Sequence, residues 1–172
     1  MADRDVERFE RTILPHLDDA YTLARYLLRD EHDAQDVVQD AVLRAFRHFH
    51  SYAGGEARAW LLAIVRNCCL TWQRRTRTDR NTIPLTADTA EASGPASDQL
   101  AIDSSERAVV TRALAELPPE FREVVVLREV EDLSYKEISD VIGVPIGTVM
   151  SRLARARKRL AALLGAGARE AS

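Results

Sequence analysis

Residues 133–159 are Leu133-Ser-Tyr-Lys-Glu-Ile-Ser-Asp-Val-Ile-Gly-Val-Pro-Ile-Gly-Thr-Val-Met-Ser-Arg-Leu-Ala-Arg-Ala-Arg-Lys-Arg159, and this pattern predicts two helices joined by a glycine turn. Ser134 and Glu137 have the spacing of a capping box, in which each side chain accepts a hydrogen bond from the other residue's amide. Gly143 suits the left-handed residue that ends the first helix, and Pro145 suits the start of the second. The stretch therefore predicts a helix-turn-helix.

The second helix of this pair has two different faces. Its apolar residues repeat at helical spacing and predict a buried stripe: Val149, Leu153, Ala156 and Leu160. The other side carries polar and basic residues: Thr148, Ser151, Arg152, Arg155 and Arg159. Between Arg152 and Arg159, five of eight residues are basic and none is acidic. One buried face and one arginine-rich face are typical of a helix that enters the major groove, so we predict DNA binding.

The overall charge of the chain does not contradict this prediction. The net charge is −3, but the charges are segregated along the sequence. Residues 30–43 contain five acidic residues and no Lys or Arg, whereas residues 66–80 contain five arginines and one Asp. Because a local face decides binding, the net charge does not exclude a nucleic-acid partner. An apolar content of 46% excludes disorder throughout the chain.

The remaining pattern is helical and divides the chain in two. Helices are expected over residues 21–28, 33–49 and 59–75, with a loop at 51–57 marked by two glycines, and again from about 106 to 130 with a break at Pro118-Pro119. Residues 81–106 have five acidic residues and no basic one, which is typical of a linker. We predict an all-α fold of two small helical domains, 1–78 and 106–172, joined by a flexible acidic linker at 79–105.

The predicted helix over 33–49 has an apolar stripe and a charged one. The expected core stripe is Val38, Val42, Ala45, Phe46 and Phe49, and the opposite stripe is Asp36, Gln39, Asp40, Leu43 and Arg47. A leucine within a charged stripe is consistent with a surface for a partner protein. It is also consistent with an isolated exposed apolar residue, which is common. The pattern alone favours the second interpretation.

The predicted helix over 59–75 also has two sides. Leu61, Ile64, Val65, Cys68 and Trp72 share one face, whereas Arg66, Asn67, Gln73 and Arg74 lie away from it. Tyr52 and Trp60, close to these polar residues, could stack on unpaired bases. The alternative is that the tryptophans are core residues; the pattern favours this for Trp72 and leaves Trp60 evenly balanced. Cys68 and Cys69 are expected to be packing residues.

The sequence gives no pattern for catalysis, a cofactor, a metal or a membrane span. The cysteines are adjacent, with no metal-binding spacing, and His48-x-His50 lacks further regular ligands. Phosphate-binding loops and nucleophile elbows are missing. The apolar runs are too short to cross a bilayer, and the polar start is unlike a signal peptide. We therefore expect a cytoplasmic protein that is not an enzyme.

Three segments, taken in this order, resemble one known family. Residues 33–46, residues 59–67 with the arginines that follow, and residues 117–128 with the helix-turn-helix are similar to regions 2.2, 2.3–2.4 and 4 of sigma-70 factors. The resemblance is to the short extracytoplasmic-function (ECF) group, and covers the chain except its linker and termini. It implies a sigma region 2 helical bundle and a sigma region 4 helix-turn-helix.

The resemblance also implies a function and a role for each face. The chain would bind core RNA polymerase, direct it to −10 and −35 promoter elements and melt the −10 region. Core polymerase would contact Asp36, Gln39, Asp40, Leu43 and Arg47, which reverses the preference for an isolated Leu43. The −10 DNA would contact Ser51, Tyr52, Gly54, Gly55, Trp60, Arg66, Asn67 and Arg74. The −35 DNA would contact Thr148, Ser151, Arg152, Arg155, Lys158 and Arg159, with Arg157, Lys158 and Arg159 better placed for phosphates or solvent.

Partners and alternatives follow from the same resemblance. The implied partners are core RNA polymerase, promoter DNA and an anti-sigma factor packed between the two domains, with no membrane insertion. The linker would follow the RNA exit path or be a plain solvated tether. Met150 departs from the Lys or Arg of many relatives, which puts one groove contact in doubt. The alternatives are a stand-alone helix-turn-helix regulator, which leaves the first domain without a role, and a sigma-like decoy for an anti-sigma factor, which would not need its DNA-facing arginines.

Overall fold

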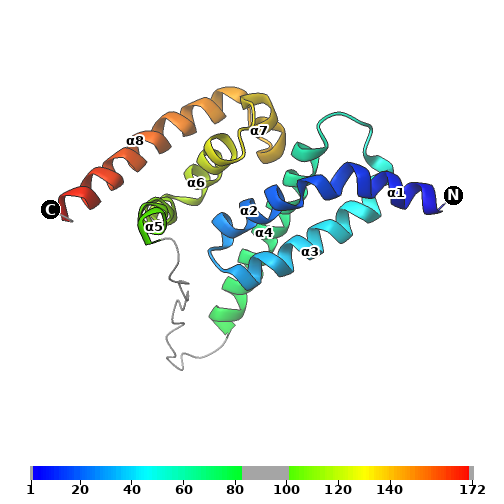
Figure 1. The fold of residues 1–172 in the computed structure, drawn as a ribbon, viewed down its shortest axis with the longest axis horizontal. Helices are drawn as coiled ribbons and strands as arrows, with labels where there is room; N and C mark the ends of the chain where they lie inside the picture. Colours follow the sequence, from blue (N-terminus) through cyan, green and yellow to red (C-terminus); the bar gives the residue numbers. More distant parts are fainter. Residues whose placement is uncertain (1, 83–100, 171–172) are drawn as a thin grey trace.

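The computed structural model describes residues 2–82 and 101–170, and every regular element in these two ranges is helical. The first lobe contains α1 (Ala2–Ile13), the short η1 (Leu14–His16), α2 (Leu17–Leu28), α3 (Glu31–His48), the short η2 (Phe49–Ser51) and α4 (Ala57–Thr82). The second lobe contains α5 (Ala101–Glu116), α6 (Pro119–Val125), the π-helical turn η3 (Val126–Val130), α7 (Tyr135–Ile142) and α8 (Ile146–Glu170). Figure 1 shows the two lobes side by side. The predicted all-α fold is confirmed.

Several helices are longer than the sequence pattern predicted. α3 begins two residues before the expected position because the Asp30 carboxylate caps it, accepting a hydrogen bond from the Asp33 amide at 2.9 Å. α4 and α5 extend into both ends of the predicted linker, so that residues 79–82 and 101–105 are helical rather than loosely ordered. The rest of the predicted linker, residues 83–100, lies outside the described residues.

The core stripe predicted for α3 is partly wrong. The buried residues are Ala34, Val37, Ala41 and Ala45, whereas Val38 and Val42 are half-buried and Phe46 is 45% exposed. Small alanine side chains let α3 pack against both α2 and α4, and this close packing selects the alanine-rich stripe over the stripe with larger side chains. Phe46 lies instead at the rim, with its ring in edge contact with Phe9 of α1.

The second lobe matches its local sequence signals closely. The Ser134–Glu137 capping box forms with both hydrogen bonds, and Gly143 ends α7 with a φ of +73°. Val149, Leu153 and Ala156 are buried as predicted, and Leu160 is half-buried. α8 packs across α6 and α7, so its apolar stripe closes the core of this lobe.

Arg122 holds the start of the second lobe together. Its guanidinium donates hydrogen bonds to the carbonyls of Leu114, Ala115 and Leu117 at 2.7 to 2.9 Å. These carbonyls lie at the end of α5, where helical hydrogen bonding leaves acceptors unpaired. Burial lowers the pKa of Arg122, and the nearby Arg29 adds to this shift. Arg122 therefore acts as a buried cap on α5, just before the helix-turn-helix.

The two lobes are in direct contact. α4 packs against α7, and α2 contacts α5, α6 and η3. The buried apolar residues of both lobes form one continuous cluster. The chain is therefore not two bodies held only by a linker, and this arrangement determines which predicted site residues are free.

Candidate functional site

The turn before α8 is fixed by side-chain hydrogen bonds. Ser139 Oγ donates to the Val144 carbonyl at 2.5 Å, across the Gly143 turn. Arg128 donates to the Leu133 carbonyl at 2.8 Å, and its guanidinium lies 4.9 Å from the centre of the Tyr135 ring. These contacts hold α7 and α8 at a set angle and so orient the face of α8 that carries the predicted −35 residues.

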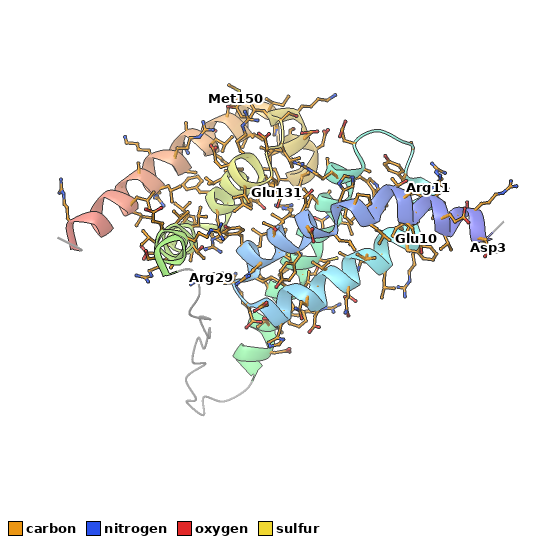
Figure 2. The ribbon with its side chains drawn as sticks, viewed as in Figure 1. Asp3, Glu10, Arg11, Arg29, Glu131 and Met150 are labelled. Atoms are coloured by element: carbon orange, nitrogen blue, oxygen red, sulfur yellow. The ribbon has the colours of Figure 1, made fainter. Side chains whose placement is uncertain are left out.

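The predicted −35 residues lie together on the outer side of α8. Ser151, Arg155, Lys158 and Arg159 are exposed, and Thr148 and Arg152 are half-buried. Figure 2 shows Met150 near the start of the same helix, on the outside of the molecule, and its side chain is 52% exposed. The predicted −35 residues thus form a polar and basic surface on α8.

Two arginines at the end of this surface have partners within the second lobe. Arg157, predicted to meet phosphates or solvent, pairs with Glu129 at 2.6 Å, and this hydrogen bond raises the pKa of Arg157. The Arg159 guanidinium lies 5.4 Å from the centre of the Phe121 ring, a cation–π distance. Arg157 thus serves the packing of the lobe, and Arg159, although exposed, is partly fixed by Phe121.

The outer face of α4 carries three of the predicted −10 residues. Trp60, Asn67 and Arg74 follow each other at seven-residue intervals and therefore share one side of the helix. Asn67 and Arg74 are exposed, and Trp60 is half-buried. This face points away from the buried stripe of the lobe, which contains Leu61 and Val65.

Aromatic rings connect this face to the loop before α4. The Trp60 ring lies 5.3 Å from the Tyr52 ring, and Tyr52 stacks on Phe49 at 5.6 Å. The Tyr52 hydroxyl donates to the Gly55 carbonyl at 2.6 Å. Gly54 has a φ of +93° and Gly55 a φ of +96°, a conformation that favours glycine. Tyr52 and Trp60 are therefore neither wholly core nor wholly free: both are half-buried, Tyr52 in the loop before α4 and Trp60 in the first turn of that helix.

Two other predicted −10 residues make contacts that the sequence did not indicate. Ser51 Oγ donates to the His48 carbonyl at 2.6 Å. Arg66 lies on a different side of α4 from Asn67 and makes two hydrogen bonds to Glu123 of α6, at 2.9 and 3.1 Å. The structure therefore separates Arg66 from the other predicted −10 residues, and no local sequence signal could have shown this, since Arg66 and Glu123 are 57 residues apart.

The charged stripe of α3 forms an exposed surface. Asp36, Gln39, Asp40, Leu43 and Arg47 are all exposed, with Leu43 at 54%. Phe46, misassigned to the core, lies three residues beyond Leu43 and so on a neighbouring part of the helix surface. Together they give α3 an apolar patch within a charged rim, which is typical of protein-binding surfaces. The helical spacing of Phe46 from Leu43 was the signal that the sequence interpretation missed.

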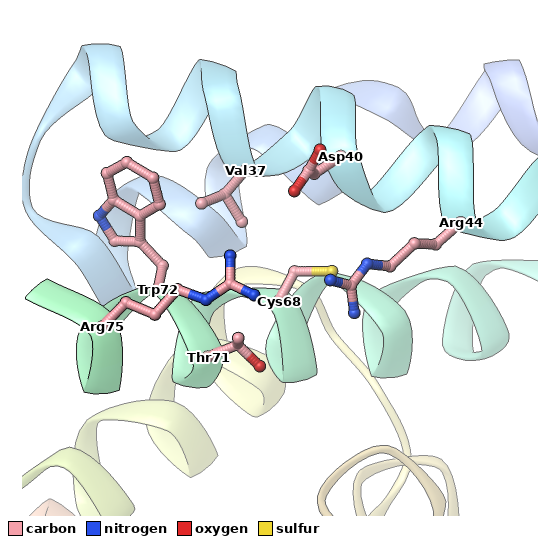
Figure 3. A pocket seen from close by; sticks show the side chains of 7 residues that line it. All are labelled: Val37, Asp40, Arg44, Cys68, Thr71, Trp72 and Arg75. Carbon is pink, nitrogen blue, oxygen red and sulfur yellow. The ribbon is translucent and has the colours of Figure 1, made fainter.

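A small cavity lies between α3 and α4 (Figure 3). Its lining, shown in Figure 3, is Val37, Asp40, Arg44, Cys68, Thr71, Trp72 and Arg75, and its volume is about 20 Å³. This volume holds about one water molecule. Burial raises the pKa of the Cys68 thiol and raises that of Cys69 to about 12. Both cysteines therefore stay protonated near neutral pH, which agrees with the predicted packing role.

A metal site and a membrane span are both absent from the described ranges. Residues 2–82 and 101–170 contain no group of three His, Cys, Asp or Glu side chains arranged to hold a metal ion, and His48-x-His50 is no exception. No helix in the same ranges has the length and apolar character needed to span a membrane.

Comparison with known proteins identifies both lobes. The family profile of sigma-70 region 2 matches residues 12–78, and that of sigma-70 region 4 matches residues 107–160. The chain is 40% identical over 159 residues to the ECF RNA polymerase sigma factor SigM of Mycobacterium tuberculosis, covering 91% of this chain and 77% of that one. It is also 39% identical over 153 residues to the ECF RNA polymerase sigma factor SigE of Mycolicibacterium smegmatis. This match covers 88% of this chain but only 60% of the relative's length.

Two solved structures resemble the whole arrangement. The sigma factor RpoE of Bartonella quintana, solved with the anti-sigma factor NepR, matches with a TM-score of 0.72 and 28% identity, covering 92% of this chain and 98% of that one. CnrH, solved with the cytosolic domain of CnrY, matches with a TM-score of 0.64 and 28% identity, covering 92% and 88%.

Proposed function

This chain belongs to the ECF group of the sigma-70 family of RNA polymerase sigma factors, and on that premise we propose that it binds core RNA polymerase and directs it to −10 and −35 promoter elements. The observation that carries the proposal is the presence, in one chain, of a basic recognition face on α8 and a polar, aromatic face on α4. A factor that reads both elements needs two DNA-facing surfaces.

The surface for core polymerase is the exposed stripe of α3. Asp36, Gln39, Asp40, Leu43 and Arg47 form its charged and apolar parts, and we add Phe46 because of its 45% exposure beside Leu43. Because about half of each residue is already buried, burying the rest of Leu43 and Phe46 would contribute roughly 1 kcal/mol each. The charged rim would set orientation rather than add much affinity.

The first lobe would read and open the −10 element. The proposed contacts are Ser51, Tyr52, Gly54, Gly55, Trp60, Arg66, Asn67 and Arg74. Unpairing and unstacking a base costs a few kcal/mol, which stacking on Tyr52 or Trp60, at about 1–3 kcal/mol per base, would offset. Because those contacts form only with an opened strand, recognition would favour melting.

The second lobe would read the −35 element through the major groove. The proposed contacts are Thr148, Ser151, Arg152, Arg155, Lys158 and Arg159. Thr148, Ser151 and Arg152 lie in the first turns of α8, where a recognition helix reaches base edges. Lys158 and Arg159 lie further along the helix, where phosphate contacts would add affinity and salt dependence rather than sequence preference.

Regulation by an anti-sigma factor is a further part of the proposal. The Bartonella protein and CnrH, which share both lobes with this chain, were each solved with a binding partner, and for the Bartonella protein this is an anti-sigma factor. A protein that works with core polymerase and promoter DNA acts in the cytoplasm, where we place this chain. No catalytic role is part of the proposal.

Reconstituted transcription tests the proposal. The purified chain is mixed with cognate core RNA polymerase, and the complex is isolated by gel filtration and supplied with a promoter library. We expect co-elution and run-off transcripts from a subset of promoters sharing −10 and −35 sequences. Binding to duplex DNA without core polymerase, together with no co-elution, would contradict the proposal and would instead indicate a stand-alone regulator.

A further inference from the structure

Two large apolar side chains are exposed on the first turns of α8. Ile146 is 43% exposed and Met150 is 52% exposed. They are four residues apart, so they lie one helical turn from each other on the same side of the helix. Figure 2 shows Met150 at the outer edge of the second lobe. A single exposed apolar residue is ordinary, but two on adjacent turns form a patch that folding of the lobe does not explain.

The neighbours of this pair on the helix surface are small and uncharged. Gly147 precedes Met150 by three positions and Ala154 follows it by four, and both are exposed. A Cβ atom added at Gly147 would meet nothing within 4 Å, and the φ of this residue is not in the left-handed region. Neither packing within the chain nor backbone conformation therefore requires glycine here, and its missing side chain lets a partner approach the helix closely. Ile146, Gly147, Met150 and Ala154 together form the α8 apolar patch.

The α8 apolar patch is continuous with the surface proposed for the −35 element. Ser151 directly follows Met150 and Arg155 directly follows Ala154, and both of these polar residues are exposed. The sequence has no acidic residue between Ile146 and Arg169, so DNA meets no like charge along this stretch of α8. The first turns of a recognition helix are also the part that reaches base edges. These features favour duplex DNA as the partner that covers the patch.

The major groove presents one apolar group, the C5 methyl of thymine. The edges of guanine, cytosine and adenine there offer hydrogen-bond donors and acceptors. Ile146 has no hydrogen-bonding group on its side chain, and the Met150 side chain has only a weak sulfur acceptor. Neither residue can therefore read the polar edges well, whereas both can pack against a methyl group. The unbranched methionine side chain also adapts its shape to an irregular surface.

We propose that Met150 and Ile146 determine part of the −35 specificity of this chain by packing against thymine methyl groups. The −35 element then carries thymine, on one strand or the other, at positions covered by the first turns of α8. A Lys or Arg at position 150 would instead donate hydrogen bonds to guanine acceptors or to a phosphate. The inference deepens the proposed function and rests on it, because it requires that α8 enters the major groove of the −35 element.

Replacing single thymines by uracil tests this contact, because the exchange removes the C5 methyl and keeps the base pair. Holoenzyme made from the full chain and cognate core binds a labelled promoter from the transcription experiment, with each −35 thymine exchanged in turn. The test variants are Met150→Ala and Ile146→Ala, and Met150→Leu keeps an apolar side chain. The matched control is Val109→Ala, which shortens a 45% exposed apolar residue on α5 of the same lobe. Fluorescence anisotropy gives each Kd, and circular dichroism confirms that each variant is folded.

We expect uracil at one −35 thymine to weaken binding of the wild type roughly fourfold, the loss for one buried methyl group. The same exchange should leave the affinity of Met150→Ala almost unchanged, because the side chain that contacts the methyl is already missing. Met150→Leu and Val109→Ala should keep the wild-type loss. Ile146→Ala should abolish the loss at a neighbouring thymine. Comparing the exchange in each pair of proteins isolates the contact between side chain and methyl.

Three results would overturn the proposal. They are wild-type binding that is indifferent to uracil at every −35 thymine, a uracil effect that persists in both alanine variants, and a selected −35 element that lacks thymine. If Met150→Ala weakens binding to core polymerase and leaves the uracil effect intact, the patch is a protein contact instead. When any of these occurs while holoenzyme still prefers its −35 element to a scrambled one, the proposed function stands and only this inference fails. A chain that never binds core polymerase removes both.

Discussion

The two lobes each build a long helix with a face suited to DNA, yet they leave different parts of that face free. On α8, Arg155 and Lys158 are exposed, and Arg157 finds its partner, Glu129, within the same lobe. On α4, Asn67 and Arg74 are exposed, but Arg66 is paired to the other lobe. The proposed DNA-binding side chains of α8 are therefore largely exposed, whereas Arg66, one of the proposed −10 contacts on α4, is bonded to the second lobe.

Arg122 is the residue on which the stability of the second lobe depends most, because it caps the end of α5. Arg122→Met removes three hydrogen bonds to the end of α5 and leaves their carbonyls buried. We expect the free energy of unfolding to fall by roughly 3–5 kcal/mol. Urea titration followed by circular dichroism measures the loss. Arg112→Met, an exposed change on α5, is the control; equal stability of the two variants would contradict the capping role.

A substitution at Leu43 tests the exposed stripe of α3 as the surface that binds core polymerase. Leu43→Asp places a charge in the apolar part of the α3 stripe, and we expect core-polymerase binding to weaken by roughly 2–4 kcal/mol. Fluorescence anisotropy with labelled chain and cognate core measures the affinity. Gln35→Asp, exposed on α3 outside the stripe, should bind like the wild type. If Leu43→Asp binds core polymerase as tightly as the wild type, Leu43 does not contact the polymerase.

The features predicted from the sequence are those with short-range causes. The Ser134–Glu137 capping box and the Gly143 turn depend on residues three to nine positions apart, and both form as expected. Phe46 was misassigned because the prediction weighted large apolar side chains, whereas close helix packing selected Ala34 and Ala41 beside the correctly predicted Ala45.

The interlobe contacts could not be predicted in the same way. Arg66 and Glu123 are 57 residues apart, and Arg58 and the Glu131 carbonyl are 73 apart. Neither pair has a spacing or motif that marks it, because the contacts depend on how two finished lobes dock. The candidate DNA face of α8 was therefore predictable from the local sequence pattern, whereas the side of α4 that contacts the second lobe was not.

Substitutions in α8 separate base contacts from phosphate contacts. Arg152→Ala should cost roughly 1–3 kcal/mol at a matched −35 site and less at a mismatched one, if Arg152 contacts a base edge. Lys158→Ala should weaken binding to both sites alike and reduce the salt dependence. Holoenzyme binding to short duplexes at several salt concentrations measures both. Equal losses on both duplexes for Arg152→Ala would reduce its role to a phosphate contact.

Glu131 couples the stability of the chain to pH. Burial raises the pKa of Glu131 from 4.5 to about 7; the Asp19 carboxylate adds to the rise and Arg58 opposes it. The folded chain therefore holds this proton more tightly than the unfolded chain. The stability that Glu131 contributes is fully present below its unfolded pKa of 4.5 and is lost as the pH rises to about 7.

Thermal unfolding across this pH range checks the Glu131 prediction. The wild-type Tm should fall by roughly 5–10 °C more than that of Glu131→Gln, which cannot ionise, because the raised pKa is worth about 3 kcal/mol. Asp19 and the neighbouring His16, whose Nδ1 lies 4.0 Å from the Asp19 carboxylate, are the same in both proteins, so the difference reports Glu131. Parallel curves for the two proteins would show that its ionisation is not coupled to folding.

Permanganate mapping of unpaired thymines tests most directly whether the α4 face opens promoter DNA. Holoenzyme formed from this chain and cognate core is placed on a promoter selected in the transcription experiment. We predict reactive thymines confined to the −10 region, and their loss with Trp60→Ala at unchanged −35 protection. Holoenzyme that occupies the promoter but leaves the −10 thymines unreactive, or that opens them equally with Trp60→Ala, would show that the α4 face does not open the promoter.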